Sequence, residues 1–90
     1  MKLGQVVATS RIVRKTTEDG KFFDFIVSCL ERYRRSDWGD TCEEDQKLNN
    51  DAVKYGNDRI VAKYDHSYGS IFIITEYDRS ATTILFAEEY

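Results

Sequence analysis

An amphipathic pattern between residues 20 and 35 constrains the fold of this chain more than any other feature. Six apolar side chains recur at the i, i+3, i+4, i+7, i+8 and i+11 spacing of one helical face: Phe22, Phe25, Ile26, Cys29, Leu30 and Tyr33. The last turn is basic, which suits the negative end of the helix dipole. We therefore predict a helix that follows Asp19-Gly20 and buries one face, with Cys29 as a small core residue.

A second helix is predicted between Thr41 and Tyr55. Thr41 and Glu44 have the spacing of a capping box, in which two side chains bond the first backbone N–H groups of a helix. Gly56-Asn57 supplies a stop signal. An apolar stripe at i, i+4 and i+7 predicts the buried face of this helix: Leu48, Ala52 and Tyr55.

The last third of the chain is typical of β-structure. Three segments are rich in β-branched and aromatic residues: Arg59–Tyr64, Ile71–Tyr77 and Thr82–Phe86. The connector Asp78-Arg79-Ser80 is short, which predicts an antiparallel hairpin from the last two segments. Near the start of the chain, Leu3–Ala8 is expected to form another strand, and Ser10 is expected to cap a short turn of helix.

These elements predict a single α+β domain over residues 1–90. Ninety residues are too few for two hydrophobic cores, and the apolar fraction of 41% is sufficient for one. We expect two helices packed on one face of a small antiparallel sheet, with about three strands in a C-terminal meander and a fourth from the N-terminus. A domain of this size is modestly stable, and a homodimer would be one way to stabilise it.

The charged residues are unevenly distributed along the chain. Residues 1–35 carry eight Lys/Arg and four Asp/Glu, a net charge of +4, whereas residues 36–58 carry two and seven, a net charge of −5. Residues 59–90 carry three and five, which completes the total of −3. Without a long basic run, the chain is not expected to bind duplex nucleic acid directly. A carboxylate face that mimics phosphate remains open.

Several classes of function are disfavoured by the residues. The single histidine, His66, has no second ligand at metal-site spacing, and no phosphate-binding glycine loop is present, so no metal, cofactor or catalytic residue is assigned. A thiol–imidazole pair of His66 with Cys29 or Cys42 is a spatial question that the pattern leaves open. No segment is long and apolar enough for a membrane span or a signal peptide, so we expect a cytoplasmic protein without a membrane partner.

The first candidate site is the acidic segment RRSDWGDTCEEDQKLNND, residues 34–51. The candidate partner-binding residues are Asp37, Trp38, Asp40, Glu43, Glu44, Asp45 and Asp51. An exposed tryptophan would be a good interaction anchor. However, a monomer rarely leaves so much apolar surface in water, so we expect Trp38 to fold back on Tyr33 or Leu48. Most of the acidity is also explained by the first turn of a helix, where carboxylates are favourable.

The alternative site is the segment TEYDRSATT, residues 75–83. Glu76, Asp78 and Arg79 place acids and a cation beside Thr82 and Thr83 at a strand end. Such a group could serve general acid–base chemistry in a small ribonuclease or toxin. The same residues are common in turns, and no second basic cluster is present to hold RNA, so the structural explanation is favoured.

Several motifs resemble one protein family over nearly the whole chain. They are MKLGQVVAT at the start, SDWGDTCEED in the middle, Asn50-Asp51, DRI at 58–60 and IFIITEYDRSATTILFAEEY at the end. The chain resembles a family of small proteins encoded on phages, plasmids and conjugative elements of Gram-positive bacteria. The final twenty residues are the most specific part of the resemblance.

The resemblance implies a context rather than a chemistry, because the family brings no established activity with it. It implies an accessory gene of a mobile element. Small acidic proteins in that setting often bind host machinery, including CRISPR effectors and restriction enzymes. We therefore expect a non-enzymatic protein that binds a host or defence-system protein, with an acidic surface facing a basic nucleic-acid channel.

Overall fold

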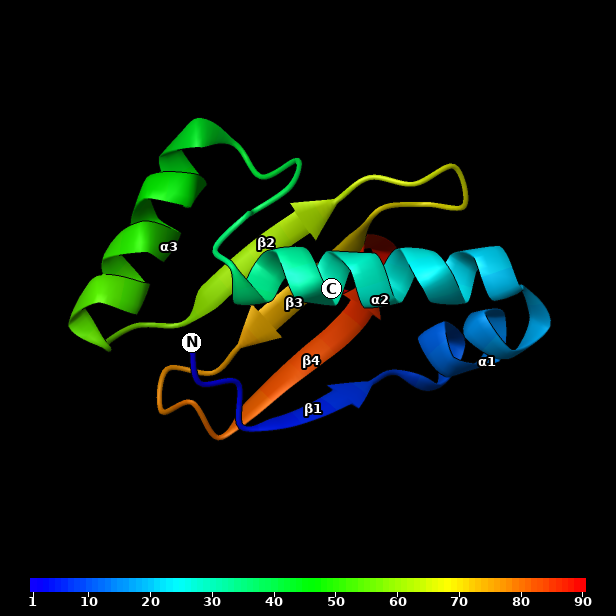
Figure 1. Ribbon diagram of the computed structural model, residues 1–90, viewed down its shortest axis with the longest axis horizontal. Coiled ribbons are helices and arrows are strands. Elements are labelled where there is room, and N and C mark those ends of the chain that lie inside the picture. The colour runs from blue at the N-terminus through cyan, green and yellow to red at the C-terminus, as the bar shows by residue number, and fades with distance from the viewer.

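Four strands form one mixed sheet in the computed structural model, which describes residues 1–90 (Figure 1). The strands are β1 (Gln5–Ala8), β2 (Ile60–Tyr64), β3 (Ile71–Thr75) and β4 (Ala81–Phe86). Their order across the sheet is β1-β4-β3-β2, in which β2, β3 and β4 form an antiparallel meander and β1 pairs with β4 in parallel. The predicted α+β class and its meander are confirmed, although the sheet is mixed rather than wholly antiparallel.

The parallel pairing of β1 follows from the long connection that separates it from β4. Three helices lie in this connection: α1 (Ser10–Glu18), α2 (Gly20–Arg34) and α3 (Glu43–Tyr55). Parallel neighbours need a crossover of this kind, whereas a tight turn joins only antiparallel strands. A short 3-10 helix, η1 (Ala87–Glu89), ends the chain.

Polar side chains cap the starts of α1 and α2. The Thr9 hydroxyl accepts a hydrogen bond from the Ile12 amide at 3.4 Å, and α1 then continues for nine residues rather than the single turn expected from Ser10. The Asp19 carboxylate accepts from the amides of Lys21 and Phe22, at 2.9 and 3.3 Å. One residue therefore ends α1 and caps α2.

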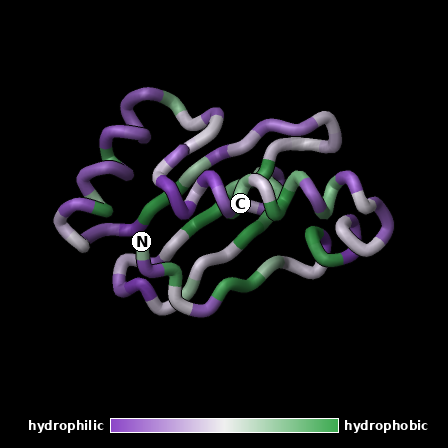
Figure 2. The backbone as a smooth tube through the Cα atoms, viewed as in Figure 1, coloured by the Kyte–Doolittle hydropathy of each residue, from purple (hydrophilic) through white to green (hydrophobic).

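Helix α2 supplies the main helical contribution to the core. It lies across one face of the sheet, where the strands are the most hydrophobic part of the chain (Figures 1 and 2). Its buried residues match the predicted stripe: Phe22, Ile26, Cys29 and Tyr33. Alternate strand residues pack beneath them, including Ile60, Ile73 and Ile84.

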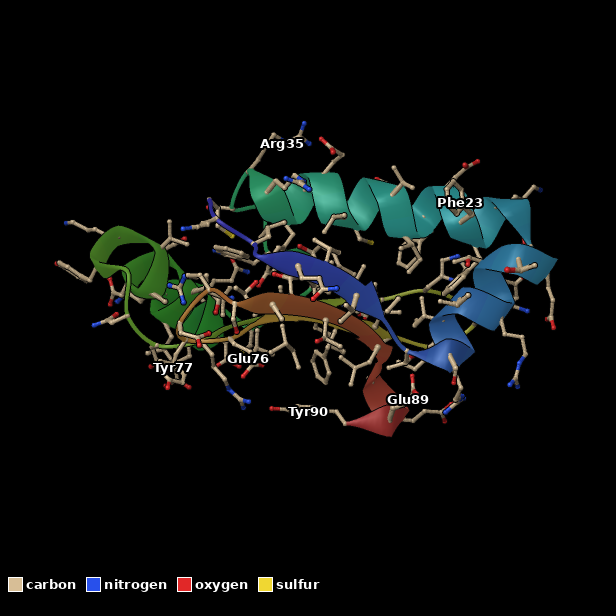
Figure 3. All side chains as sticks on the ribbon, turned by 90° about the horizontal axis from the view of Figure 1, so that it is seen from below. Phe23, Arg35, Glu76, Tyr77, Glu89 and Tyr90 are labelled. Carbon is tan, nitrogen blue, oxygen red and sulfur yellow. The ribbon has the colours of Figure 1, made fainter.

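Helix α3 is oriented differently from the prediction. Leu48 and Tyr55 were expected in the core with Ala52, but their side chains are 63% and 65% exposed. The buried residues of α3 are Asn49 and Ala52. The helix lies beside β2 at the edge of the sheet, rather than on the face that α2 covers (Figures 1 and 3).

The predicted capping box at the start of α3 is also wrong. Cys42 is the N-cap and its side chain makes no capping hydrogen bond. The Thr41 hydroxyl is engaged elsewhere, because it donates to the Trp38 carbonyl at 2.5 Å and accepts from the Lys63 amide at 2.8 Å. A tertiary contact with β2 has replaced the local cap.

Polar groups close the outer edge of β2. The Asn49 amide donates to the Val61 carbonyl at 2.9 Å and accepts from the Val61 amide at 3.2 Å. Two residues further on, the Lys63 amide donates to the Thr41 hydroxyl. The Lys63 carbonyl accepts from the Asp40 amide at 2.8 Å. The backbone groups that an edge strand would present to another chain are therefore already bonded.

A buried chain of hydrogen bonds ties α2 to the sheet and to the N-terminus. The Tyr33 hydroxyl lies 2.8 Å from Thr75 Oγ1, which lies 2.8 Å from Thr82 Oγ1. Thr82 donates to the Leu3 carbonyl at 2.7 Å, so it must accept from Thr75, and Thr75 must accept from Tyr33. Each hydroxyl is thus satisfied in the interior, and burial raises the pKa of Tyr33 to about 12.

Replacement of Thr82 by valine should destabilise the protein by about 1–3 kcal/mol, because the buried Leu3 carbonyl and the Thr75 hydroxyl would both lose partners. The measurement is the free energy of unfolding in urea. Thr83→Val is the matched control, since Thr83 lies on the opposite face of β4 without a side-chain hydrogen bond. Equal losses in the two variants would contradict the assigned role of this chain.

Candidate functional site

Trp38 belongs to the core rather than to a partner-binding surface. Its side chain is only 3% exposed and meets the Tyr33 ring edge-on, with 5.4 Å between ring centroids. The indole N–H donates to Asn50 Oδ1 at 2.8 Å. The expectation that Trp38 folds back on Tyr33 is confirmed, and direct contact between its indole and a partner would require local opening.

The two carboxylates beside Trp38 are engaged within the chain. Asp37 pairs with Arg32, with 2.9 Å between Oδ2 and Nε, and it accepts from the Gly39 amide at 3.1 Å. These contacts, the Arg32 hydrogen bond first, hold the pKa of Asp37 below its ordinary value. Asp40 Oδ2 accepts from the Asp65 amide at 2.8 Å. These two carboxylates therefore stabilise the turn ahead of α3.

The acids of α3 are different, because they are exposed and free of hydrogen bonds and ion pairs within the chain. They are Glu43, Glu44, Asp45 and Asp51. Three of them occupy the first turn, where the helix dipole favours them. That location explains their stability but leaves their charge available to another molecule.

Acidic and apolar residues share one exposed side of α3. Glu44, Leu48, Asp51 and Tyr55 follow the i, i+4, i+7 and i+11 positions of a single stripe. All four are exposed. A helix of a monomer normally turns such an apolar pair inward, so this outward stripe is the first unusual feature of the surface.

The stripe borders a groove between α3 and the sheet. Two adjoining hollows, of about 380 and 240 Å³, share Asp45, Val61 and Phe72. The remaining lining residues are Asp40, Thr41, Cys42, Leu48, Asn49, Asp58, Arg59, Lys63 and Tyr90. We call this feature the α3 groove; it has an apolar floor and a rim that carries both charges.

The groove continues onto the sheet face that α2 does not cover, here called the open face. Strand alternation places Val61, Phe72 and Ile74 on it. The Tyr90 ring meets Phe72 edge-on, at 5.3 Å between centroids. Figure 3 shows Tyr90 and Tyr77 on this side, opposite α2, and both tyrosines are exposed.

The alternative site around Arg79 is built as a structural clamp. The Arg79 guanidinium donates to five backbone carbonyls, those of Ala52, Asn57, Asp58, Glu76 and Tyr77. It thereby joins the end of α3 and the following loop to the β3–β4 turn. Asp78 accepts from the Ser80 amide at 3.0 Å. The carboxylates of Glu76 and Asp78 form no ion pair with Arg79. A cation bonded in this way has few donors left for a substrate.

Arg79→Ala should lower the free energy of unfolding by about 2 kcal/mol, because five carbonyls lose a charged donor. Arg79→Lys should recover less than half of this loss, since an ammonium group lacks the guanidinium fork. Urea unfolding measures both. Arg34→Ala, at an exposed site without a side-chain hydrogen bond, is the control. A stable Arg79→Ala protein would contradict the clamp.

The possible thiol–imidazole pair is not assembled. Cys29 is buried, and desolvation raises the pKa of its thiol to about 12. Cys42 is exposed at the start of α3. His66 packs against Phe25 at 4.4 Å between ring centroids, and its Nδ1 accepts from the Tyr68 amide at 3.2 Å. That nitrogen is therefore occupied, and no hydrogen bond joins the imidazole to either thiol.

The two cysteines should differ sharply toward a thiol reagent such as Ellman's reagent at neutral pH. Cys42 should react in the native protein because it is accessible, and Cys29 only after unfolding because it is buried with a raised pKa. Counting reactive thiols with and without denaturant tests this. Two fast thiols in the native state would contradict the packing of α2.

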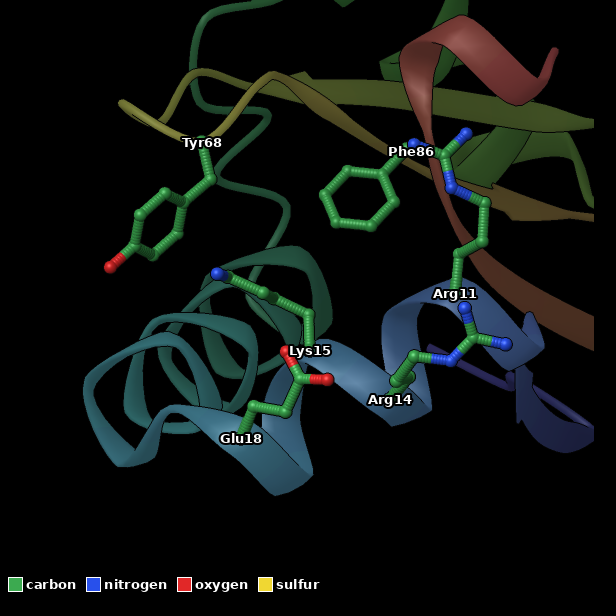
Figure 4. A pocket seen from close by; sticks show the side chains of 6 residues that line it. All are labelled: Arg11, Arg14, Lys15, Glu18, Tyr68 and Phe86. Atoms are coloured by element: carbon green, nitrogen blue, oxygen red, sulfur yellow. The ribbon is translucent and has the colours of Figure 1, made fainter.

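A third hollow, of about 280 Å³, lies beside α1 (Figure 4). Its lining residues are Arg11, Arg14, Lys15, Glu18, Tyr68 and Phe86. Arg11 pairs with Glu88, and Lys15 Nζ lies 4.0 Å from the centroid of the Tyr68 ring. The cations are thus partly satisfied by the protein itself, and Glu18 is the one carboxylate that accompanies them.

The chain has neither a metal-binding cluster nor a helix that could cross a membrane. No three side chains among His, Cys, Asp and Glu gather closely enough to hold a metal ion. None of the helices combines the length and the apolar character that a membrane crossing requires. Comparisons with protein-family models, with curated proteins and with solved structures returned no match to this chain.

Sequence reasoning identified part of the α3 groove and missed the rest. Asp40 and Asp45 were candidate residues and line it. Phe72 and Tyr90 were not candidates, although the position of Phe72 between core-facing Ile71 and Ile73 placed it on the opposite face of β3. That alternation was the available signal.

Proposed function

We propose that this protein is a non-enzymatic binding protein that acts by contacting another protein through the α3 groove and the adjoining open face. The observation that supports this most strongly is the orientation of α3. The helix buries Asn49 and Ala52 and leaves Leu48 and Tyr55 in solvent. Apolar side chains in that position acquire a favourable environment only when a partner covers them.

The charge pattern indicates the chemistry of the partner. Four carboxylates of α3 are exposed and unpaired, against two exposed lysines of the same helix, Lys47 and Lys54. Of the groove cations, Lys63 pairs with Asp65, and Arg59 donates to the neutral Tyr90 hydroxyl. The net charge of the surface is therefore negative. A partner with Lys or Arg side chains around an apolar contact would complement it.

The aromatic residues favour a protein partner over a small molecule. Phe72 and Tyr90 form the floor of a shallow groove, and Tyr55 and Tyr77 stand exposed beyond it. Tyrosine and phenylalanine are enriched at the centres of protein interfaces, where they add large contact areas at low entropic cost. An extended or helical segment of a basic protein fits this surface.

We propose the biological setting from the resemblance to mobile-element proteins. In that setting the partner would be a host or defence-system protein whose basic channel ordinarily holds nucleic acid, and the acidic surface would occupy it. This identification is a proposal that rests on the resemblance, and the surface chemistry is compatible with it. The alternative site gives little support to a ribonuclease, since its one cation, Arg79, already donates to five backbone carbonyls.

Charge reversal on α3 tests the proposal. The protein would be immobilised and used to capture partners from lysates of bacteria that carry defence systems, and the captured protein would then be purified for direct titration. Glu44→Lys with Asp45→Lys should weaken binding by about 2 kcal/mol or more, and binding of the parent should fall as salt is raised. Leu48→Ala should weaken it without changing the salt dependence.

The matched control reverses two exposed acids elsewhere. Asp24→Lys with Glu31→Lys makes the same change in net charge on α2, and neither residue makes a side-chain hydrogen bond or ion pair. Circular dichroism confirms that both double variants are folded. If the two double variants bind equally well, or if only the α2 variant fails, the α3 groove is not the binding surface.

A further inference from the structure

The two edges of the sheet are built in opposite ways. At the β2 edge, Val61 and Lys63 have their outward backbone groups bonded by residues of α3 and the preceding turn. At the β1 edge, Gln5 and Thr9 donate inward to Ser80 and Ile84. Backbone direction alternates along a strand, so the intervening residues present their N–H and C=O groups outward.

Those outward residues of β1 are Val6 and Ala8. Their amides and carbonyls make no hydrogen bond with the loops, the helices or any side chain of the chain. The strand carries neither a charge nor a proline, the usual guards of an open edge. Val6 and Val7 are each 38% exposed. One edge of the sheet is therefore closed and the other is left available for pairing.

Two apolar residues of α2 are exposed outside the core. Phe22 and Ile26 point into the core, and Phe25 packs toward His66 beyond the β2 side. The helical repeat places Phe23 and Val27 on the opposite flank, toward β1, and Figure 3 shows Phe23 on the outside of α2. Both side chains are about half exposed.

We propose that two copies of the chain pair through β1, antiparallel and edge to edge, about a two-fold axis at Val7. In this register Val6 of each copy faces Ala8 of the other, and the two pairs exchange four backbone hydrogen bonds. Centring the axis on Val6 or Ala8 would bring in Gly4, with φ +64°, or Ser10 of α1. Neither is extended, so those registers lose half of the bonds.

The arrangement makes one eight-stranded sheet and pairs the outward backbone groups of Val6 and Ala8. The axis is perpendicular to the sheet, so both α2 helices lie on the same face. Each α3 groove lies at the far end, beside β2, and stays open. The dimer would therefore present two binding surfaces, and this assembly does not depend on the proposed function.

Cysteine cross-linking tests the register directly. Facing residues at the axis have Cα atoms about 4.5 Å apart, which suits a disulfide. In a Cys42→Ser background, Val7→Cys should form a covalent dimer under mild oxidation. Val6→Cys should form it far more slowly, because its counterpart is offset by two residues. Val53, on α3, is 37% exposed, and Val53→Cys is the control. If Val6→Cys or Val53→Cys cross-links as fast as Val7→Cys, the proposal is overturned.

Sedimentation equilibrium tests the assembly without oxidation. The parent chain should move from 10.5 kDa toward twice that mass as concentration rises. Val7→Lys should remain monomeric at every concentration, because two ammonium groups would meet at the axis. Val53→Lys makes the same change on α3 and should still dimerise. A parent chain that stays at 10.5 kDa, or a Val53→Lys protein that dissociates like Val7→Lys, would overturn the proposal.

Discussion

The pair of hydrogen bonds between Asn49 and the backbone of Val61 determines which side of α3 is exposed on the surface. A helix beside a small sheet usually docks through an apolar stripe. Here the contact is an amide that satisfies both backbone groups of an edge residue, at 2.9 and 3.2 Å. Because the side of α3 that carries Asn49 and the small Ala52 is the anchored one, Leu48 and Tyr55 face solvent.

Two consequences of that anchor reach the whole surface. The α3 helix stands at the edge of the sheet, so the open face keeps Phe72 accessible to Tyr90 and to a partner. The anchor also closes the β2 edge, which leaves β1 as the single strand with unpaired outward groups. The proposed recognition at one end and the proposed self-association at the other thus depend on the same packing of α3. Arg79 reinforces it by binding the Ala52 carbonyl near the end of α3.

The sequence predicted the features that depend on local periodicity. The buried face of α2, the core position of Cys29 and the β2–β3–β4 meander all follow from spacing within one segment. The predictions from sequence were wrong where a residue bonds a distant segment instead of its own helix. Thr41 had the spacing of a cap but bonds β2, and Asn49 lies in a helix whose apolar stripe pointed elsewhere. Likewise, the α3 groove joins residues of α3 and β3, which no local pattern could bring together.

The central claim is that α3 is held by the side that carries Asn49 and Ala52, and solvent-accessibility measurements by NMR test it directly. A soluble paramagnetic agent should strongly relax the Leu48 methyl groups, while the Val61 amide should be protected and exchange slowly with solvent. Asn49→Ala should release that amide to fast exchange while the inner strands stay protected. Shielded Leu48 methyl groups together with a freely exchanging Val61 amide would mean that α3 docks through its apolar stripe, and would contradict the account.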